Sequence, residues 1–127
     1  MSIDAKLGKL KILVIDDDEF IRLTIKSILK KYGCTILEAT DGNEGVSLYK
    51  RERPNITITD MLMPDKEGIE TISEIRAINP AAKIIAISGG GNTQNMAFLQ
   101  LAQKMGANRT LSKPIKPEEL LNAIQAL

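Results

Sequence analysis

Five short apolar runs alternate along the chain with five segments whose apolar residues recur at helical spacing. The apolar runs are residues 10–15, 35–39, 56–59, 83–88 and 109–112. The segments with helical spacing are residues 19–32, 41–52, 67–78, 93–105 and 117–127. Because strands that alternate with helices build a parallel sheet with helices on both faces, we predict an α/β fold with a doubly wound, five-stranded parallel sheet. The strand order that we expect for this (βα)5 arrangement is 2-1-3-4-5.

Capping residues mark the ends of the first two predicted helices. Asp18 is a favourable N-cap for the first helix, and Gly33 is expected to end it. The apolar stripe of that helix consists of Ile21, Ile25, Ile28 and Tyr32. Asp41 is the expected N-cap of the second helix, and Glu44 completes a pair that is typical of a capping box.

Length and charge indicate one domain without strong attraction to nucleic acid or membranes. The chain has 127 residues and a net charge of +1. We expect residues 1–9 to be an N-terminal extension and residues 10–127 to form the domain. Its few aromatic residues do not interleave with basic ones, so direct nucleic acid binding is not expected. No apolar run could span a bilayer and no signal-peptide pattern opens the sequence, so we expect a cytoplasmic protein that does not bind membranes.

The sequence contains no histidine and a single cysteine, Cys34. A lone thiol forms no internal disulfide, which fits a reducing compartment. The absence of histidine excludes the usual general base, a Cys/His zinc site and a self-phosphorylating histidine. Any chemistry must therefore use carboxylates, hydroxyls, lysine and a hard metal ion.

Polar residues stand at the carboxyl ends of four of the five predicted strands. Asp16 and Asp17 follow the first run, and Asp60 follows the third. Ser88 ends the fourth run, and Lys113 follows the fifth. Ligands of open α/β sheets bind beyond the carboxyl ends of the strands, and in the expected order the first and third strands are neighbours, about 5 Å apart. We therefore expect three carboxylates, a hydroxyl and an ammonium group to meet at one edge of the sheet.

Such an edge favours a divalent cation and phosphoryl transfer. Three close carboxylates repel one another and need a proton or a cation. Oxygen ligands without histidine suit Mg²⁺, which binds one or two carboxylates together with phosphate oxygens. A carboxylate beside Mg²⁺ can attack phosphorus and form an aspartyl phosphate, while the metal and a lysine neutralise the phosphoryl oxygens.

Four segments together resemble the receiver domain of two-component response regulators, in its single-domain chemotaxis-regulator form. They are ILVIDDDEF (12–20), ITITDMLMPDKEG (56–68), IIAIS (84–88) and SKP (112–114). Each segment is weak alone, but their order and their positions at strand ends make the combination specific. The resemblance covers roughly residues 10–127 and implies a flavodoxin-like fold with Mg²⁺ as cofactor.

The resemblance also implies roles for the residues around the acidic edge. Asp60 matches the phosphoacceptor. Asp17 matches the direct Mg²⁺ ligand, and Asp16 matches its neighbour in the acid pocket. Leu62 matches the position whose backbone carbonyl binds the metal, so its apolar side chain is no obstacle.

Two further positions match the family and one departs from it. Ser88 matches the switch hydroxyl that turns toward the phosphoryl group. Lys113 matches the phosphate-binding lysine, and its bond to Pro114 is expected to be cis. Thr110 stands where the family commonly has tyrosine or phenylalanine, so the aromatic part of the switch is missing.

The implied function is a signalling switch that catalyses only its own phosphorylation and autodephosphorylation. A phosphohistidine of a partner histidine kinase or phosphotransfer protein is the expected donor. Phosphorylation is expected to shift the face formed by the fourth helix, the fifth strand and the fifth helix. That face would bind a downstream effector or form a homodimer, and the chain could be a receiver cut from a larger protein with an output domain.

Two alternatives compete with this interpretation. The segment ILVIDDD also resembles the opening of haloacid-dehalogenase-type phosphatases, in which Asp16 would be the nucleophile and Asp18 the acid/base. Against that reading, no acid pair follows Lys113 and Asp60 would have no role. The second alternative, motivated by Thr110, is an interaction module that works without phosphorylation.

Overall fold

The computed structural model describes residues 7–62, 68–89 and 93–127, and for residues 93–96 and 99 it describes only the backbone. The strands are β1 (Lys11–Ile15), β2 (Thr35–Ala39), β3 (Ile56–Asp60), β4 (Ile84–Ser88) and β5 (Arg109–Ser112). The helices are α2 (Glu19–Lys30), α3 (Gly42–Glu52), α4 (Gly68–Ile78), α5 (Thr93–Met105) and α6 (Pro117–Gln125). Among these described residues, no helix is both long and apolar enough to cross a membrane.

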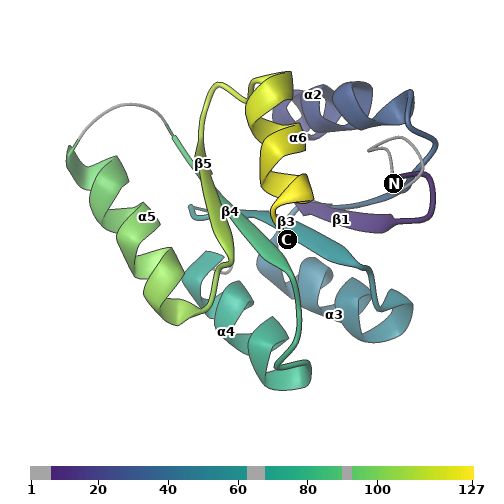
Figure 1. Cartoon of the computed structure of the whole chain (residues 1–127). Coiled ribbons are helices and arrows are strands. Elements are labelled where there is room, and N and C mark those ends of the chain that lie inside the picture. Colours follow the sequence, from purple (N-terminus) through teal and green to yellow (C-terminus); the bar gives the residue numbers. More distant parts are fainter. Residues whose placement is uncertain (1–6, 63–67, 90–92) are drawn as a thin grey trace.

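All five strands pair in parallel, in the order β2-β1-β3-β4-β5, which confirms the predicted sheet. Figure 1 shows α2 and α6 on one face of this sheet and α3, α4 and α5 on the other. The register sets Ile15 of β1 beside Thr59 of β3, and Ser88 of β4 beside Ser112 of β5. The residues that follow β1, β3 and β5 therefore leave the sheet at one common edge.

Each face of the sheet has its own hydrophobic core. Val14 and Ile58 point into the core beneath α2 and α6, whereas Leu13 and Ile15 point into the core beneath α3, α4 and α5. This alternation follows from the two-residue period of a strand, and β1, β3 and β4 are buried on both sides because helices cover both faces. The sheet is therefore a rigid support for the side chains at its edge.

Side-chain caps begin α2 and α3 as predicted. The Asp18 carboxylate accepts a hydrogen bond from the backbone N–H of Phe20 at 2.9 Å. The Asp41 carboxylate accepts one from the backbone N–H of Glu44 at 2.8 Å, and the Glu44 side chain accepts one from the backbone N–H of Thr40 at 2.6 Å. The second pair is a variant of the capping box in which the acid reaches one residue further back.

The end and the buried stripe of α2 differ from the prediction. The helix ends at Lys30 rather than Tyr32, because the last backbone bonds join residues three apart and tighten the final turn before Gly33 at φ 78°. Leu29 is fully buried whereas Ile28 is only partly buried. The prediction placed Ile28, three residues after Ile25, on the buried face of the helix. In the structure the buried residue is Leu29, four residues after Ile25.

Part of the predicted N-terminal extension belongs to the core. Leu7 is fully buried in the cluster beneath α2 and α6, and its carbonyl accepts a hydrogen bond from the backbone N–H of Leu10 at 3.0 Å. The apolar residues around Leu7 follow neither the helical nor the strand periodicity, so the sequence pattern does not indicate that Leu7 is buried. The boundary between residues 9 and 10 stays a prediction.

Arg76 links α4 to the segments that precede β4 and β5, at the edge of the sheet opposite to the acidic residues. Its guanidinium donates hydrogen bonds to the carbonyl oxygens of Pro80, Ala82 and Gly106 and to the Asn108 side chain. Several charge-assisted bonds, three of them to backbone carbonyl oxygens, are lost together in Arg76→Ala, so we expect the free energy of unfolding to fall by about 2 kcal/mol.

Urea denaturation followed by circular dichroism measures this change. Arg51→Ala is the matched control, because the Arg51 side chain is 69% exposed and forms an ion pair with the neighbouring residue Glu52. We expect that control to change stability by less than about 0.5 kcal/mol. Equal effects of the two substitutions would contradict the proposed linking role of Arg76.

Candidate functional site

An acidic cluster lies where β1 and β3 end side by side. Asp16 follows the last residue of β1, and Asp60 is the last residue of β3. Both are almost completely buried, whereas Asp17 is exposed. One carboxylate oxygen from each of the three residues lies within 4.8 Å of the others. The structure therefore brings together the three acids that the sequence analysis selected.

Lys113 reaches this cluster from β5, two strands away from β3. Its ammonium nitrogen lies 3.4 Å from Oδ2 of Asp16 and 3.6 Å from Oδ1 of Asp60. Its backbone N–H donates a hydrogen bond of 2.8 Å to the carbonyl of Ser88, which ties the start of the loop after β5 to the end of β4. The lysine is mostly buried, so its charge acts on the two acids with little screening by water.

Burial controls the ionisation of the two inner acids. Burial, followed by the nearby charge of Asp16, raises the pKa of Asp60 from 3.8 to about 6, although Lys113 opposes the shift. Burial likewise raises the pKa of Asp16, and hydrogen bonding to Asp18 together with Lys113 opposes it. A single ammonium group thus offsets the three carboxylates only in part.

The cluster meets the requirements of a divalent cation. Oδ2 of Asp16 is buried and accepts no hydrogen bond, although Lys113 forms an ion pair with it. The ion pair with Lys113 offsets the cost of burying this oxygen only in part, and a metal ion or a water molecule would satisfy it further. The donor set consists of carboxylate oxygens, which suits a hard ion such as Mg²⁺.

Comparison with known proteins identifies the family. The family model of the response regulator receiver domain matches residues 12–125. The chain belongs to this family. It is a receiver domain, the phosphoacceptor switch of two-component signalling.

Relatives of this receiver domain cover almost its whole length. Chemotaxis protein CheY of Thermotoga maritima is 39% identical over 119 residues, which are 93% of this chain and 96% of that protein. Protein PilG of Pseudomonas aeruginosa is 34% identical and covers 92% of this chain and 86% of its own length.

Solved structures agree with this assignment. A receiver domain protein from Clostridium thermocellum has a TM-score of 0.84 at 34% identity, with 92% of both chains covered. The CheX-CheY-BeF3-Mg²⁺ complex from Borrelia burgdorferi contains a chain with a TM-score of 0.83 at 28% identity, covering 92% of this chain and 87% of that one.

Three further expectations of the sequence analysis concern residues at or just after the ends of β3, β4 and β5. Ser88 is buried at the end of β4, the strand between β3 and β5. Leu62 follows the buried Met61 and is half exposed. The bond between Lys113 and Pro114 is cis, as predicted. Residues 63–67 of the ITITDMLMPDKEG segment lie outside the described residues.

The sequence analysis assigned no role to two residues that shape the site, Gly68 and Arg22. A Cβ at Gly68 would lie 2.2 Å from the carbonyl oxygen of Asp60, so only glycine lets α4 begin this close to the end of β3. Arg22 donates a hydrogen bond of 2.8 Å to the carbonyl oxygen of Asp16. A glycine at the start of a predicted helix is a sequence feature that could have indicated the close approach of Gly68 to β3. An arginine within a helix carries no such indication of the Arg22 contact.

The phosphatase alternative is not favoured by these findings. The family match places the chain among receiver domains, which are signalling modules rather than turnover enzymes. Asp18, the acid/base in that alternative, is exposed and caps α2. Asp60, which that alternative leaves without a role, is one of the three acids of the cluster.

Proposed function

We propose that Asp60 accepts the phosphoryl group. Its carboxylate ends a strand at the sheet edge, is flanked by Asp16, and has Lys113 beside it at 3.6 Å. An Asp60 oxygen forms the new bond to phosphorus as the phosphorus–nitrogen bond to the donor imidazole breaks, and the electron pair stays with the imidazole. The aspartyl phosphate that results is the signalling state.

Mg²⁺ is the proposed cofactor, with Asp16, Asp17, Asp60 and the backbone carbonyl of Leu62 as the groups that would hold it. Oδ2 of Asp16, which is buried and has an ion pair but no hydrogen bond, and the spacing of the three acids support this assignment. The bound ion would neutralise charge on the phosphoryl oxygens. A divalent charge would also offset the repulsion that the single ammonium group leaves among the carboxylates.

Lys113 and Ser88 are proposed to contact the transferred group. Lys113 already spans the two inner acids, so a small movement of its flexible side chain would place the ammonium group on a phosphoryl oxygen. Ser88 would donate a hydrogen bond from its hydroxyl at the end of β4. Both groups would then stabilise negative charge that exists only after the phosphoryl group arrives.

The signal is proposed to leave through α5, β5 and α6. β5 carries Thr110, and the loop after β5 carries Lys113, so a change at Lys113 acts directly on this strand. Thr110 lacks the aromatic ring usual at this position, and we propose that the hydroxyl and lysine movements suffice for the switch. The partner is an effector, an output domain or a second copy of the chain, and we propose no direct contact with nucleic acid.

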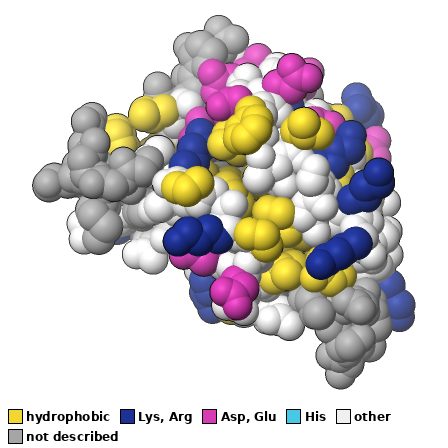
Figure 2. All heavy atoms as spheres, turned by 90° about the horizontal axis from the view of Figure 1, so that it is seen from above, with side chains coloured by type: hydrophobic (Ala, Val, Ile, Leu, Met, Phe, Trp, Pro, Cys, Tyr) yellow, Lys and Arg dark blue, Asp and Glu magenta, His cyan; other side chains and the backbone are white. Residues whose placement is uncertain are grey.

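The donor is proposed to be a histidine kinase or phosphotransfer protein that covers the start of α2. Figure 2 looks onto the face formed by α2 and α6, where hydrophobic side chains lie among charged ones. Phe20 and Leu23 of α2 are 71% and 57% exposed, and Leu62, two residues after Asp60, is 50% exposed. Exposed apolar groups beside a polar site are typical of protein contact surfaces.

Phosphorylation by a small donor tests the proposal. We expect the protein to gain one phosphoryl mass in intact mass spectrometry after incubation with acetyl phosphate and Mg²⁺, and to gain none with EDTA. Peptide mapping after borohydride trapping is expected to place the group on Asp60.

Asp18→Asn is the matched control. Asparagine caps a helix as well as aspartate, so the variant is expected to fold and to take up the phosphoryl group normally. A phosphatase that uses Asp16 and Asp18 would lose activity in this variant and would hydrolyse phosphate esters continuously. Absence of any phosphoryl gain in the native chain would instead support the interaction-module alternative.

A further inference from the structure

Asp16 is held at every polar atom except the one that faces Lys113. Its backbone N–H donates to the carbonyl of Ala39 at 3.1 Å, and its Oδ1 accepts from the backbone N–H of Asp18 at 2.9 Å. Its carbonyl oxygen accepts from Nη1 of Arg22 at 2.8 Å. The remaining oxygen, Oδ2, accepts no hydrogen bond. This arrangement leaves one buried acceptor aimed at the acidic cluster.

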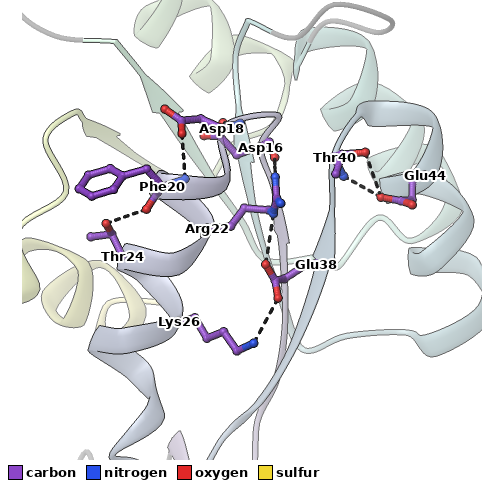
Figure 3. A network of polar contacts seen from close by, with 9 residues as sticks. All are labelled: Asp16, Asp18, Phe20, Arg22, Thr24, Lys26, Glu38, Thr40 and Glu44. Carbon is purple, nitrogen blue, oxygen red and sulfur yellow. Dashed lines mark hydrogen bonds and ion pairs between the residues drawn. The ribbon is translucent and has the colours of Figure 1, made fainter.

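The third of these contacts belongs to a second polar network, drawn in Figure 3. Nε of Arg22 donates to Oε1 of Glu38 on β2 at 3.2 Å, and the Arg22 side chain is only 13% exposed. Lys26, one turn further along α2, pairs with the other oxygen of Glu38 at 3.4 Å. The planar, rigid guanidinium of Arg22 therefore links the residue after β1 to the edge strand β2, through Nη1 on one side and Nε on the other.

The carbonyl of Asp16 belongs to the peptide group that leads into Asp17. Rotation of that peptide group changes the direction of the Asp17 side chain, which is exposed and for which no hydrogen bond to another described residue is found. The backbone on its two sides is therefore what places the Asp17 carboxylate near the other two acids. Octahedral ions such as Mg²⁺ tolerate little error in ligand position.

We propose that Arg22 is a positioning residue for the metal site: by holding the carbonyl of Asp16, it sets the direction in which Asp16 and Asp17 present their carboxylates to the cation. Glu38 orients Arg22 in turn. This inference rests on the proposed function, because it assumes that the acidic cluster binds Mg²⁺. It assigns to Arg22 a role that its place on an amphipathic helix does not imply.

The direction in which Arg22→Ala changes the Mg²⁺ dissociation constant distinguishes a positioning role from a purely electrostatic effect of the arginine charge. Loss of a positive charge near three carboxylates would by itself strengthen the binding of a cation. Loss of a group that orients metal ligands weakens binding, typically by 10- to 100-fold for contacts of this kind. Arg22→Ala is therefore expected to raise the Mg²⁺ dissociation constant about tenfold, which is opposite to the direction that charge removal predicts.

Isothermal titration of each variant with Mg²⁺, without any phosphodonor, tests the inference. Lys26→Ala is the matched control. Lys26 lies on α2 like Arg22 and pairs with the same carboxylate of Glu38, but its hydrogen bond goes to Glu38 and not to Asp16. We expect its dissociation constant to stay within twofold of the native value. Arg22→Lys keeps the positive charge but lacks the planar guanidinium that bonds both Asp16 and Glu38. Its Mg²⁺ dissociation constant is therefore expected to rise by a smaller factor than that of Arg22→Ala.

An unchanged or lower dissociation constant in Arg22→Ala would overturn the inference, even if the variant melts at a lower temperature. If Arg22→Ala does not fold, Arg22→Lys and Glu38→Gln decide, and unchanged Mg²⁺ affinity in both would overturn it. Failure of the proposed function is distinguishable, because the native chain would then bind no Mg²⁺ or gain no phosphoryl group.

Discussion

Asp60→Asn is expected to abolish phosphoryl uptake and, at the same time, to stabilise the metal-free protein by about 2 kcal/mol at pH 8. An amide cannot replace the carboxylate as the attacking group. The same substitution removes a buried charge that lies beside Asp16. Function and stability are therefore expected to change in opposite directions, which is uncommon for a buried residue.

The pH dependence of this stabilisation follows from the pKa of Asp60. Burial raises that pKa from 3.8 to about 6, so the folded state binds this proton more tightly than the unfolded state. The contribution of the carboxyl to stability is then complete below pH 3.8 and is lost as the pH rises through 6. The advantage of Asp60→Asn over the native chain should be large at pH 8 and should shrink toward pH 4. The raised pKa of Asp16 acts in the same direction in both proteins.

Urea denaturation in EDTA at pH 8 and pH 5, together with intact mass after acetyl phosphate treatment, measures both effects. Asp41→Asn is the control, because it makes the same chemical change at a helix cap, where the two residues are equivalent. Mg²⁺ should stabilise the native chain more than Asp60→Asn. The explanation would be wrong if Asp60→Asn were the less stable protein at pH 8, or if its advantage did not depend on pH.

Lys113→Ala is expected to slow phosphorylation by acetyl phosphate about 10²- to 10³-fold without preventing Mg²⁺ binding. The ammonium group lies 3.4 Å from Asp16 and 3.6 Å from Asp60, where it can neutralise a phosphoryl oxygen. Its removal leaves more negative charge for the cation, so the Mg²⁺ dissociation constant should stay equal or fall. The metal-free variant should be less stable at pH 8 than the native chain, because two buried carboxylates lose their counter-charge.

Single-turnover phosphorylation followed by mass spectrometry, and titration with Mg²⁺, separate these effects. Lys116→Ala is the control, since Lys116 is exposed, lies only three residues along the chain and makes no side-chain cap to α6. We expect it to be phosphorylated at the native rate. A native rate in Lys113→Ala would exclude the proposed contact with the phosphoryl group, and a loss of Mg²⁺ binding would show that the lysine instead supports the metal site.

The acids of the site could be selected from the sequence because each stands where a periodic pattern stops. An apolar run that ends in Asp16 or Asp60 marks the end of a buried strand, and parallel strands bring their carboxyl ends to one edge. The positions of Ser88 and Lys113 followed from the same rule. The resemblance to receiver domains then supplied a proposed role for each, and the family match confirms the resemblance itself.

The local pattern of the sequence thus determined the strands, the helices and the edge at which the three acids gather, because strand and helix periods are set by backbone geometry. Only the tertiary structure decided that Arg22 holds the carbonyl of Asp16, that Leu29 rather than Ile28 faces the sheet, and that Leu7 is buried. It also decided the depth of burial that raises the pKa of Asp60. These features depend on the directions and distances of side chains from separate elements, which no period along a single chain encodes.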